Sequence, residues 1–165
     1  MPVHKELQSR LHDALALELN LRPYLREWET HVSSPALRLR LEEAVSSIGP
    51  EADGLARCLH LLGAQPRLAA ESPLLEVFRL QDSQRRAEAP LETDLRGAVS
   101  VLALGSVKAG LYRSMIALAG AARSPEVEAA LHALLAHLEH DLAHLQEVFQ
   151  ALLSEARGEA RREAA

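Results

Sequence analysis

The sequence predicts an all-α fold, in which four long helices form one domain and a short helix lies in the long connection between the second and the third. The chain has 165 residues, of which 48% are hydrophobic and 25% charged, as in a single globular domain. Val, Ile and Thr, which favour strands, number only nine, two and two. Apolar residues recur at spacings of three and four over long segments, which indicates amphipathic helices.

Serine caps helices and proline suits their first position, so each Ser-Pro pair predicts a helix start. The predicted helices cover about residues 3–32, Pro35 to Gly63, Pro73 to Ala87, 92–122 and 125–155. Proline removes an amide donor, so a kink or break is expected at Gly49-Pro50. Residues 1–155 should form the single bundle, and 156–165 a charged, frayed tail.

The lengths of the connections predict the topology. The first and second helices, and likewise the third and fourth long helices, are joined by short links, whereas a long crossover separates the two pairs. From this pattern we expect the first and third long helices to run parallel.

Charge and composition exclude several classes of function. The net charge is −5 and basic residues are scattered among acids, so no nucleic-acid surface is predicted. The polar start of the sequence predicts a cytoplasmic protein, and the single Cys58, at a seam position, is expected in the core. Lys108 and Arg113 interrupt the long apolar stretch Val99–Ala122, which predicts a deeply buried helix and no membrane contact.

Two charged residues interrupt the apolar seams of the helices. Glu18 lies among leucines in the first helix, and Lys108 is the only charge in the seam of the third long helix. Because an unpaired buried charge is costly, we expect the two to face each other near mid-height. Tyr112, one turn beyond Lys108, can hydrogen-bond into the same cluster.

The spacing of these and three further polar residues resembles that of ferritin-like di-iron carboxylate proteins, including bacterioferritin and rubrerythrin. Two 33-residue intervals separate Glu18 from Glu51 and Lys108 from Asp141, and the motif from Asp141 to His144 is acid-x-x-His. In that family, one Glu from each of two helices and a Glu-x-x-His from each of the others point inward. The resemblance covers about residues 5–150 and implies as ligand positions Glu18, Glu51, Asp141 and His144.

The sequence departs from this pattern at two ligand positions. Gly54 stands where the first His is expected, and Lys108 stands where the second lone Glu is expected. An ammonium removes a ligand and repels the metal, so the resemblance implies a degenerate di-iron site.

A second resemblance is to the YciE/YciF-like branch of ferritin-like stress proteins. The residues that carry it are Asp13 to Glu18, Ser33 to Val45, and SPEVEAALHALL before the last helix. Ala44 departs from the polar His expected in that branch, and Gly105 stands where an acid is expected. The resemblance therefore implies the fold more strongly than the chemistry.

Three interpretations of Glu18 and Lys108 stay open at this stage. The two can form an internal ion pair. Alternatively, Glu18, Glu51, Asp141 and His144 retain a site for iron or another divalent metal. In the third interpretation Lys108 reaches a bundle end or an interface, and Glu18 meets water or Arg22.

The last helix carries a second candidate metal site. Four possible ligands in this helix are spaced at i, i+3, i+4 and i+7, which aligns their ligand atoms along one helix face. They are His137, His140, Asp141 and His144. The helical wheel places His140 nearly opposite the core and His137 on the flank, so the alternative is a solvated surface.

The third long helix predicts a partner. Gly105, Gly110 and Gly120 keep it slender, and it is apolar nearly all round, so its outer side should also be covered. We therefore expect a homodimer through this glycine- and alanine-rich region.

The predicted function is that of a stress-associated ferritin-like protein that has lost its di-iron centre. A polar core cluster would replace the metal, and its members would be Glu18, Glu51, Lys108, Tyr112, Asp141 and His144. No catalytic residue and no cofactor are expected, and Lys108 argues against ferroxidase or oxidase activity. The alternatives are a variant iron-binding or iron-oxidising protein with a mononuclear or atypical site, and a homo-oligomeric helical interaction module.

Overall fold

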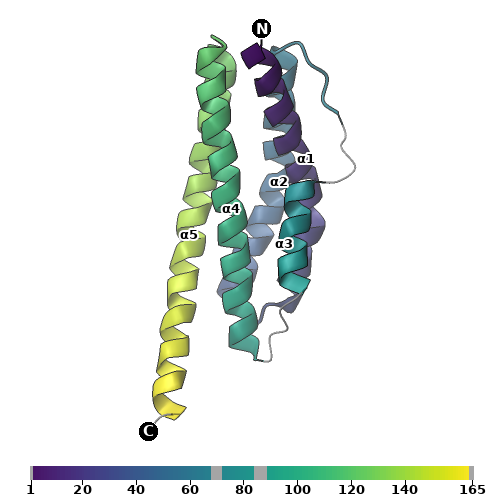
Figure 1. Cartoon of the computed structure of the whole chain (residues 1–165). Helices are drawn as coiled ribbons and strands as arrows, with labels where there is room; N and C mark the ends of the chain where they lie inside the picture. Colours follow the sequence, from purple (N-terminus) through teal and green to yellow (C-terminus); the bar gives the residue numbers. More distant parts are fainter. Residues whose placement is uncertain (1, 68–71, 84–88, 164–165) are drawn as a thin grey trace.

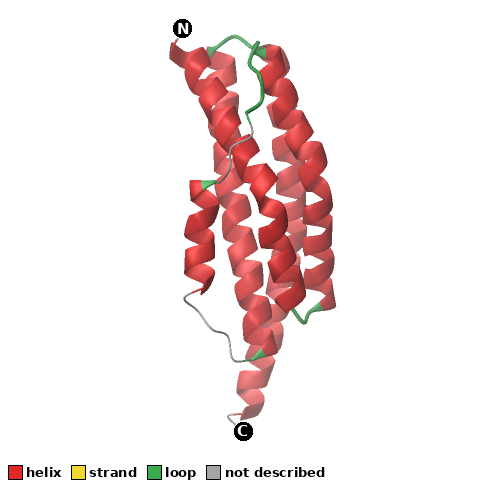
Figure 2. Cartoon of the chain, turned by 90° about the vertical axis from the view of Figure 1, so that its right-hand side faces the viewer, coloured by secondary structure: helices red, strands yellow, loops and turns green. Residues whose placement is uncertain are grey.

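A computed structural model describes residues 2–67, 72–83 and 89–163, and all regular structure in these ranges is helical (Figures 1 and 2). In chain order the helices are α1 (Pro2–His31), α2 (Pro35–Leu61), α3 (Pro73–Ser83), α4 (Pro90–Ala121) and α5 (Pro125–Glu163). The prediction of an all-α fold with a short helix in the crossover is confirmed. Residues 84–87, predicted as the end of that helix, lie outside the described residues.

The Ser-Pro pairs mark helix starts as predicted. Pro35, Pro73 and Pro125 are each the first residue of a helix. At α2 the Ser34 side chain accepts a hydrogen bond of 3.3 Å from the Leu37 amide, so it satisfies one of the free amides of the first turn.

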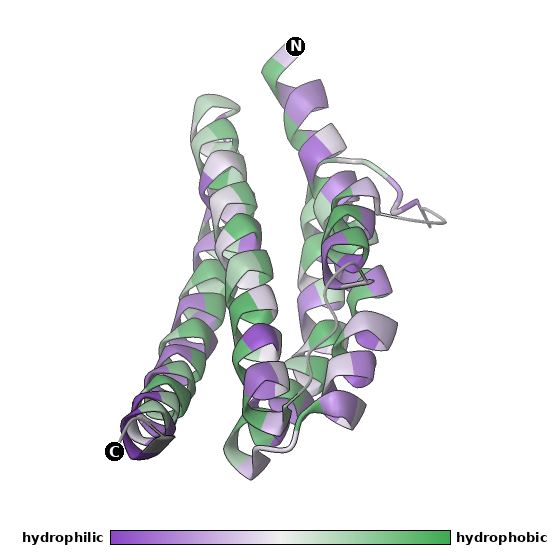
Figure 3. Cartoon of the chain, turned by 60° about the horizontal axis from the view of Figure 1, so that its bottom comes forward, coloured by the Kyte–Doolittle hydropathy of each residue, from purple (hydrophilic) through white to green (hydrophobic). Residues whose placement is uncertain are grey.

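The end predicted for the last helix is wrong, and of the two outcomes expected at Gly49-Pro50, a kink or a break, the break is absent. α2 continues through Pro50 without a break. The missing amide of Pro50 would have bonded the carbonyl of Ser46, which is exposed, so water can take its place. α5 does not end near residue 155 but continues to Glu163, where Arg161 and Arg162 suit the negative end of the helix dipole. The C-terminal end of α5 extends past the other helices and is hydrophilic (Figures 1 and 3).

The direction of α4 also differs from the prediction. Leu7 and Leu11, near the start of α1, share an apolar cluster with Met115 and Ala119, near the end of α4. α1 and α4 are therefore antiparallel, whereas α2 and α4 run in the same direction (Figure 1). The reason is that the crossover returns the chain to the end of the bundle where α2 begins.

The core consists of two apolar clusters, one toward each end of the bundle. One joins the first half of α1 to the second halves of α2 and α4, and the other joins the second half of α1 to the first halves of α2 and α4. Both clusters include residues of α5. The polar residues predicted for mid-height lie at the junction of the two clusters.

Polar contacts fix the ends and the crossover. The carboxylate of Asp94 in α4 accepts hydrogen bonds from the Ser33 and Ser34 amides, at 2.6 and 2.9 Å, and so holds the link between α1 and α2. Asp82 of α3 accepts hydrogen bonds from Tyr24 of α1 and Ser100 of α4, at 2.7 and 2.8 Å. These bonds attach α3 to the outside of the bundle.

α4 is less buried than its sequence predicts. Among the described helices it alone is long and apolar enough to cross a membrane, judged by length and composition. Only 33% of its most apolar 18-residue window is buried in the chain. Within one chain, the prediction of a deeply buried helix therefore holds for the inward face of α4, and the outward face stays exposed.

Candidate functional site

Three charged side chains from three helices meet at the centre of the bundle. Glu18 of α1, Glu51 of α2 and Lys108 of α4 are only 1%, 4% and 7% exposed. Lys108 Nζ lies 2.7 Å from Glu18 Oε2 and also contacts Glu51 Oε2. The structure thus places both carboxylates on one buried ammonium, and we call these three residues the central cluster.

Tyr112 adds a neutral donor to the central cluster. It is fully buried one turn after Lys108, and its hydroxyl donates a 3.3 Å hydrogen bond to Glu51 Oε2. Burial, followed by the negative charge of both carboxylates, raises the pKa of Tyr112 above its ordinary value. The phenol therefore stays protonated and serves as a donor to Glu51.

Burial and pairing act in opposite directions on the pKa of Glu18 and on the pKa of Lys108. Burial raises the pKa of Glu18 to about 7, although the positive charge of Lys108 opposes the shift. Burial alone would lower the pKa of Lys108, but Glu18 and Glu51 outweigh that effect and raise it. With both carboxylates ionised the central cluster carries one excess negative charge, and a proton on Glu18 removes it.

A small cavity adjoins the central cluster. Its volume is about 80 Å³, and its wall includes Glu18, Glu51, Lys108 and Asp141 among mainly aliphatic side chains. Gly105 of α4 also lines it, where a Cβ atom would overlap Leu142 Cδ2. The glycine at 105 therefore allows the close packing of α4 against α5 at this level.

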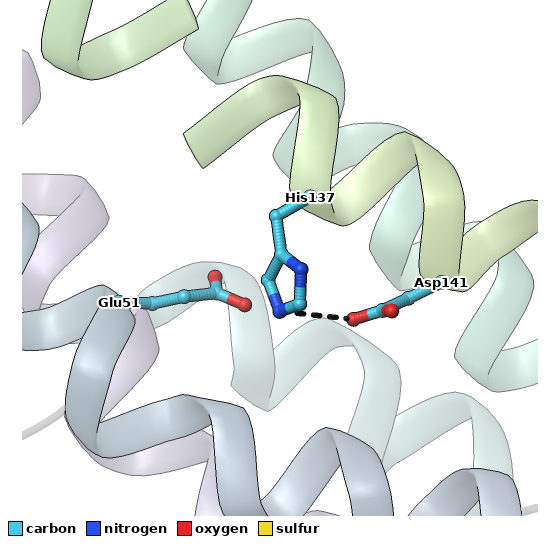
Figure 4. Close-up of side chains that lie close together, drawn as sticks. All are labelled: Glu51, His137 and Asp141. Carbon is cyan, nitrogen blue, oxygen red and sulfur yellow. Dashed lines mark ion pairs between the residues drawn. The ribbon is translucent and has the colours of Figure 1, made fainter. Parts of the chain in front are cut away.

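α5 brings a histidine to the edge of the central cluster. His137 Nε2 lies 3.5 Å from Asp141 Oδ2, and both side chains point toward Glu51 (Figure 4). One ligand atom from each of these three residues falls within 4.8 Å of the others. The sequence placed His137 on the flank of α5, and only the packing of α2 against α5 shows that this flank faces Glu51.

His144 does not join the other predicted ligands. Its Nε2 atom lies 3.2 Å from His140 Nε2, and its Nδ1 atom lies 3.5 Å from Glu147. His140 is exposed and His144 half-buried. Of the six residues predicted for the polar cluster, the structure brings Glu18, Glu51, Lys108 and Tyr112 into contact, sets Asp141 at the edge and turns His144 away.

The residues present do not fit a di-iron centre. The Lys108 ammonium lies between Glu18 and Glu51, so a bridging pair of cations would meet a positive charge. At position 54 a Cβ atom would lie 3.1 Å from Leu134 Cδ2, so an apolar side chain crowds the place of the first family histidine. The interpretation in which Lys108 extends to a bundle end, with Glu18 facing water or Arg22, is wrong.

These features define a ferritin-like helical bundle with a salt-bridged polar cluster at the centre of its core. The family model for the domain of unknown function DUF892 matches residues 3–157. The chain therefore belongs to the DUF892 family.

Solved structures of low sequence identity share the fold. The E. coli stress protein YciF matches with a TM-score of 0.85 at 10% identity, over 92% of this chain and 97% of that one. YcfI from Rhodopseudomonas palustris gives a TM-score of 0.81 at 14% identity, with coverage of 87% and 92%. A protein from Xanthomonas campestris gives 0.74 at 19% identity, with coverage of 96% and 99%. No curated protein matches the sequence.

Proposed function

We propose that this chain is a non-catalytic, stress-associated ferritin-like protein whose di-iron centre has been replaced by the central cluster. The observation that carries the proposal is the contact of the buried Lys108 ammonium with both Glu18 and Glu51. The likeness to the fold of the E. coli stress protein YciF supports the stress association.

In a ferritin-like site, metal cations balance the inward carboxylates. Here one ammonium contacts both carboxylates and neutralises one of the two negative charges, and it needs neither ligand exchange nor a change of oxidation state. The cluster therefore joins α1, α2 and α4 at one point and offers no redox chemistry of its own.

Iron titration of the purified chain tests the proposal. We expect anaerobic Fe(II) titration, followed by metal analysis and anomalous scattering from crystals, to reveal no pair of irons between Glu18 and Glu51. Two ions bound there would overturn the proposal.

Two variants of one residue supply the controls. Lys108→Glu replaces the repelling charge by a carboxylate and should bind more iron than the wild type. Lys108→Met removes the charge without adding a ligand and should bind no more iron, while losing stability because it leaves two buried carboxylates without a counter-ion. Equal iron binding in Lys108→Glu and the wild type would show that Lys108 is not what excludes the metal.

A further inference from the structure

Three side chains beside the central cluster have the geometry of a small metal site. Glu51 comes from α2, and His137 and Asp141 come from one face of α5, four residues apart. Ligand atoms of all three lie within 4.8 Å of one another. Figure 4 shows the imidazole of His137 between the two carboxylates. We call these residues the edge triad.

The three residues of the edge triad differ in exposure, from the buried core to the solvent-exposed surface. Glu51 is buried, Asp141 is half-buried and His137 is exposed. An ion can therefore arrive from water at His137 and lose part of its hydration shell as it reaches Glu51. The cavity of about 80 Å³ that Glu51 and Asp141 line adds space at the inner side.

The central cluster leaves one oxygen of Glu51 for the edge triad. Lys108 and Tyr112 both approach Glu51 through Oε2. Neither contact uses Oε1, so this oxygen is available to a further partner. His137 Nε2 has only weak partners to give up, namely Asp141 at 3.5 Å and the Ser47 hydroxyl at 3.4 Å.

We propose that Glu51, His137 and Asp141 bind a single divalent first-row transition ion, such as Zn²⁺. Two carboxylate oxygens and one neutral imidazole give the site two negative charges and a mixed oxygen and nitrogen donor set, which suits such an ion better than Ca²⁺ or Mg²⁺. The site holds one ion, because Lys108 occupies the space between Glu51 and Glu18.

This inference goes beyond the proposed function and does not depend on it. A single ion at the edge leaves the Lys108 ion pairs in place. The ligand set also differs from the one implied by the family resemblance, because it uses His137 and omits both Glu18 and His144.

Calorimetric titration of the untagged, metal-free chain with Zn²⁺ tests the site. Exposed His140 and half-buried His144 form a pair that can itself chelate an ion, so the reference protein is the His140→Ala variant. We expect this variant to bind one Zn²⁺ per chain. Adding His137→Ala should raise the dissociation constant by at least about tenfold, because it removes a direct ligand. Exposed His132, changed to Ala in the same background, is the matched control and should leave the constant unchanged.

A spectroscopic measurement separates binding from folding. Co²⁺ should give the visible absorption of a bound ion in the His140→Ala variant, and this absorption should be lost with His137→Ala or Asp141→Asn while the circular dichroism stays the same. A Zn²⁺ dissociation constant that is unchanged by His137→Ala, or Zn²⁺ binding that is already absent in His140→Ala, would overturn the proposal. Neither result would bear on whether Lys108 excludes paired irons.

Discussion

At the scale of single residues, two effects oppose each other in the central cluster: burial disfavours the charged forms of the side chains, and ion pairing favours them. Two carboxylates share one ammonium, so only one of them is neutralised when all three groups are charged. Glu18, which is 1% exposed, has its pKa raised to about 7 chiefly by burial. The charge of this residue should therefore change within the range of pH found in cells.

This pKa predicts a pH dependence of stability. The ordinary pKa of the Glu18 carboxyl is 4.5, so between pH 4.5 and about 7 the folded chain binds more protons at this site than the unfolded chain. The Glu18 contribution to the free energy of unfolding therefore falls as pH rises, by at most about 1.4 kcal/mol per pH unit in that interval. The pKa of Lys108 is raised above its ordinary range, so its charge is constant there.

Comparison of the wild type with Glu18→Gln measures this effect. The amide has nearly the same shape but does not titrate, so Glu18→Gln should gain stability relative to the wild type as the pH increases from 5 to 7. Urea unfolding at pH 5, 6, 7 and 8 gives the difference in free energy at each pH. A constant difference across that range would show that Glu18 keeps its ordinary pKa.

At the scale of helices, Asp94 links the start of α4 to the turn between α1 and α2. Its buried carboxylate accepts hydrogen bonds from two amides, those of Ser33 and Ser34. Asp94→Ala should therefore lower the free energy of unfolding by about 1–3 kcal/mol, because it leaves both amides without that acceptor. Chemical denaturation measures the loss. Exposed Asp13, changed to Ala, should have almost no effect, and an equal loss in both variants would contradict this role of Asp94.

The helices themselves could be predicted because their causes are local. Apolar spacing identified the buried faces, and the Ser-Pro pairs identified three starts. The antiparallel arrangement of α1 and α4 was missed, since it depends on where the crossover ends. The sequence could not decide between a kink and a break in α2, because the cost of Pro50 depends on whether the carbonyl of Ser46 can reach water.

Part of the candidate site could also be predicted from the sequence. Glu18 and Lys108 stood out because each is a lone charge in an apolar seam, and the structure pairs them. The four-residue spacing of His137 and Asp141 was also visible in the sequence. The approach of His137 to Glu51 was not, because it depends on the register between α2 and α5, which no local pattern encodes.

At the scale of the whole molecule, the outward face of α4 has no neighbour within the described chain. Val99 and Val107 are 48% and 39% exposed on this face. Ala103 lies exposed between them, and a Cβ atom at Gly110 would have nothing within 4 Å. Such small side chains allow a second helix to approach closely, so we propose that two copies of the chain pair through α4.

Light scattering coupled to size-exclusion chromatography tests this pairing. The wild type should elute with about twice the chain mass of 18.0 kDa. Ala103→Glu places a charge in the centre of the proposed contact and should give a monomer, whereas Ala129→Glu on an exposed part of α5 should leave the mass unchanged. A wild-type monomer, or a dimer that persists in Ala103→Glu, would contradict the pairing.

The position of Lys108 also helps to specify the register in which neighbouring helices pack. Leucine-rich helices can slide by one turn against each other and still bury apolar surface, so aliphatic contacts alone discriminate weakly between registers. A one-turn slip of α1, α2 or α4 would separate the ammonium from a carboxylate and leave an uncompensated charge in the core. The three side chains of the central cluster therefore specify how α1, α2 and α4 align along the bundle axis.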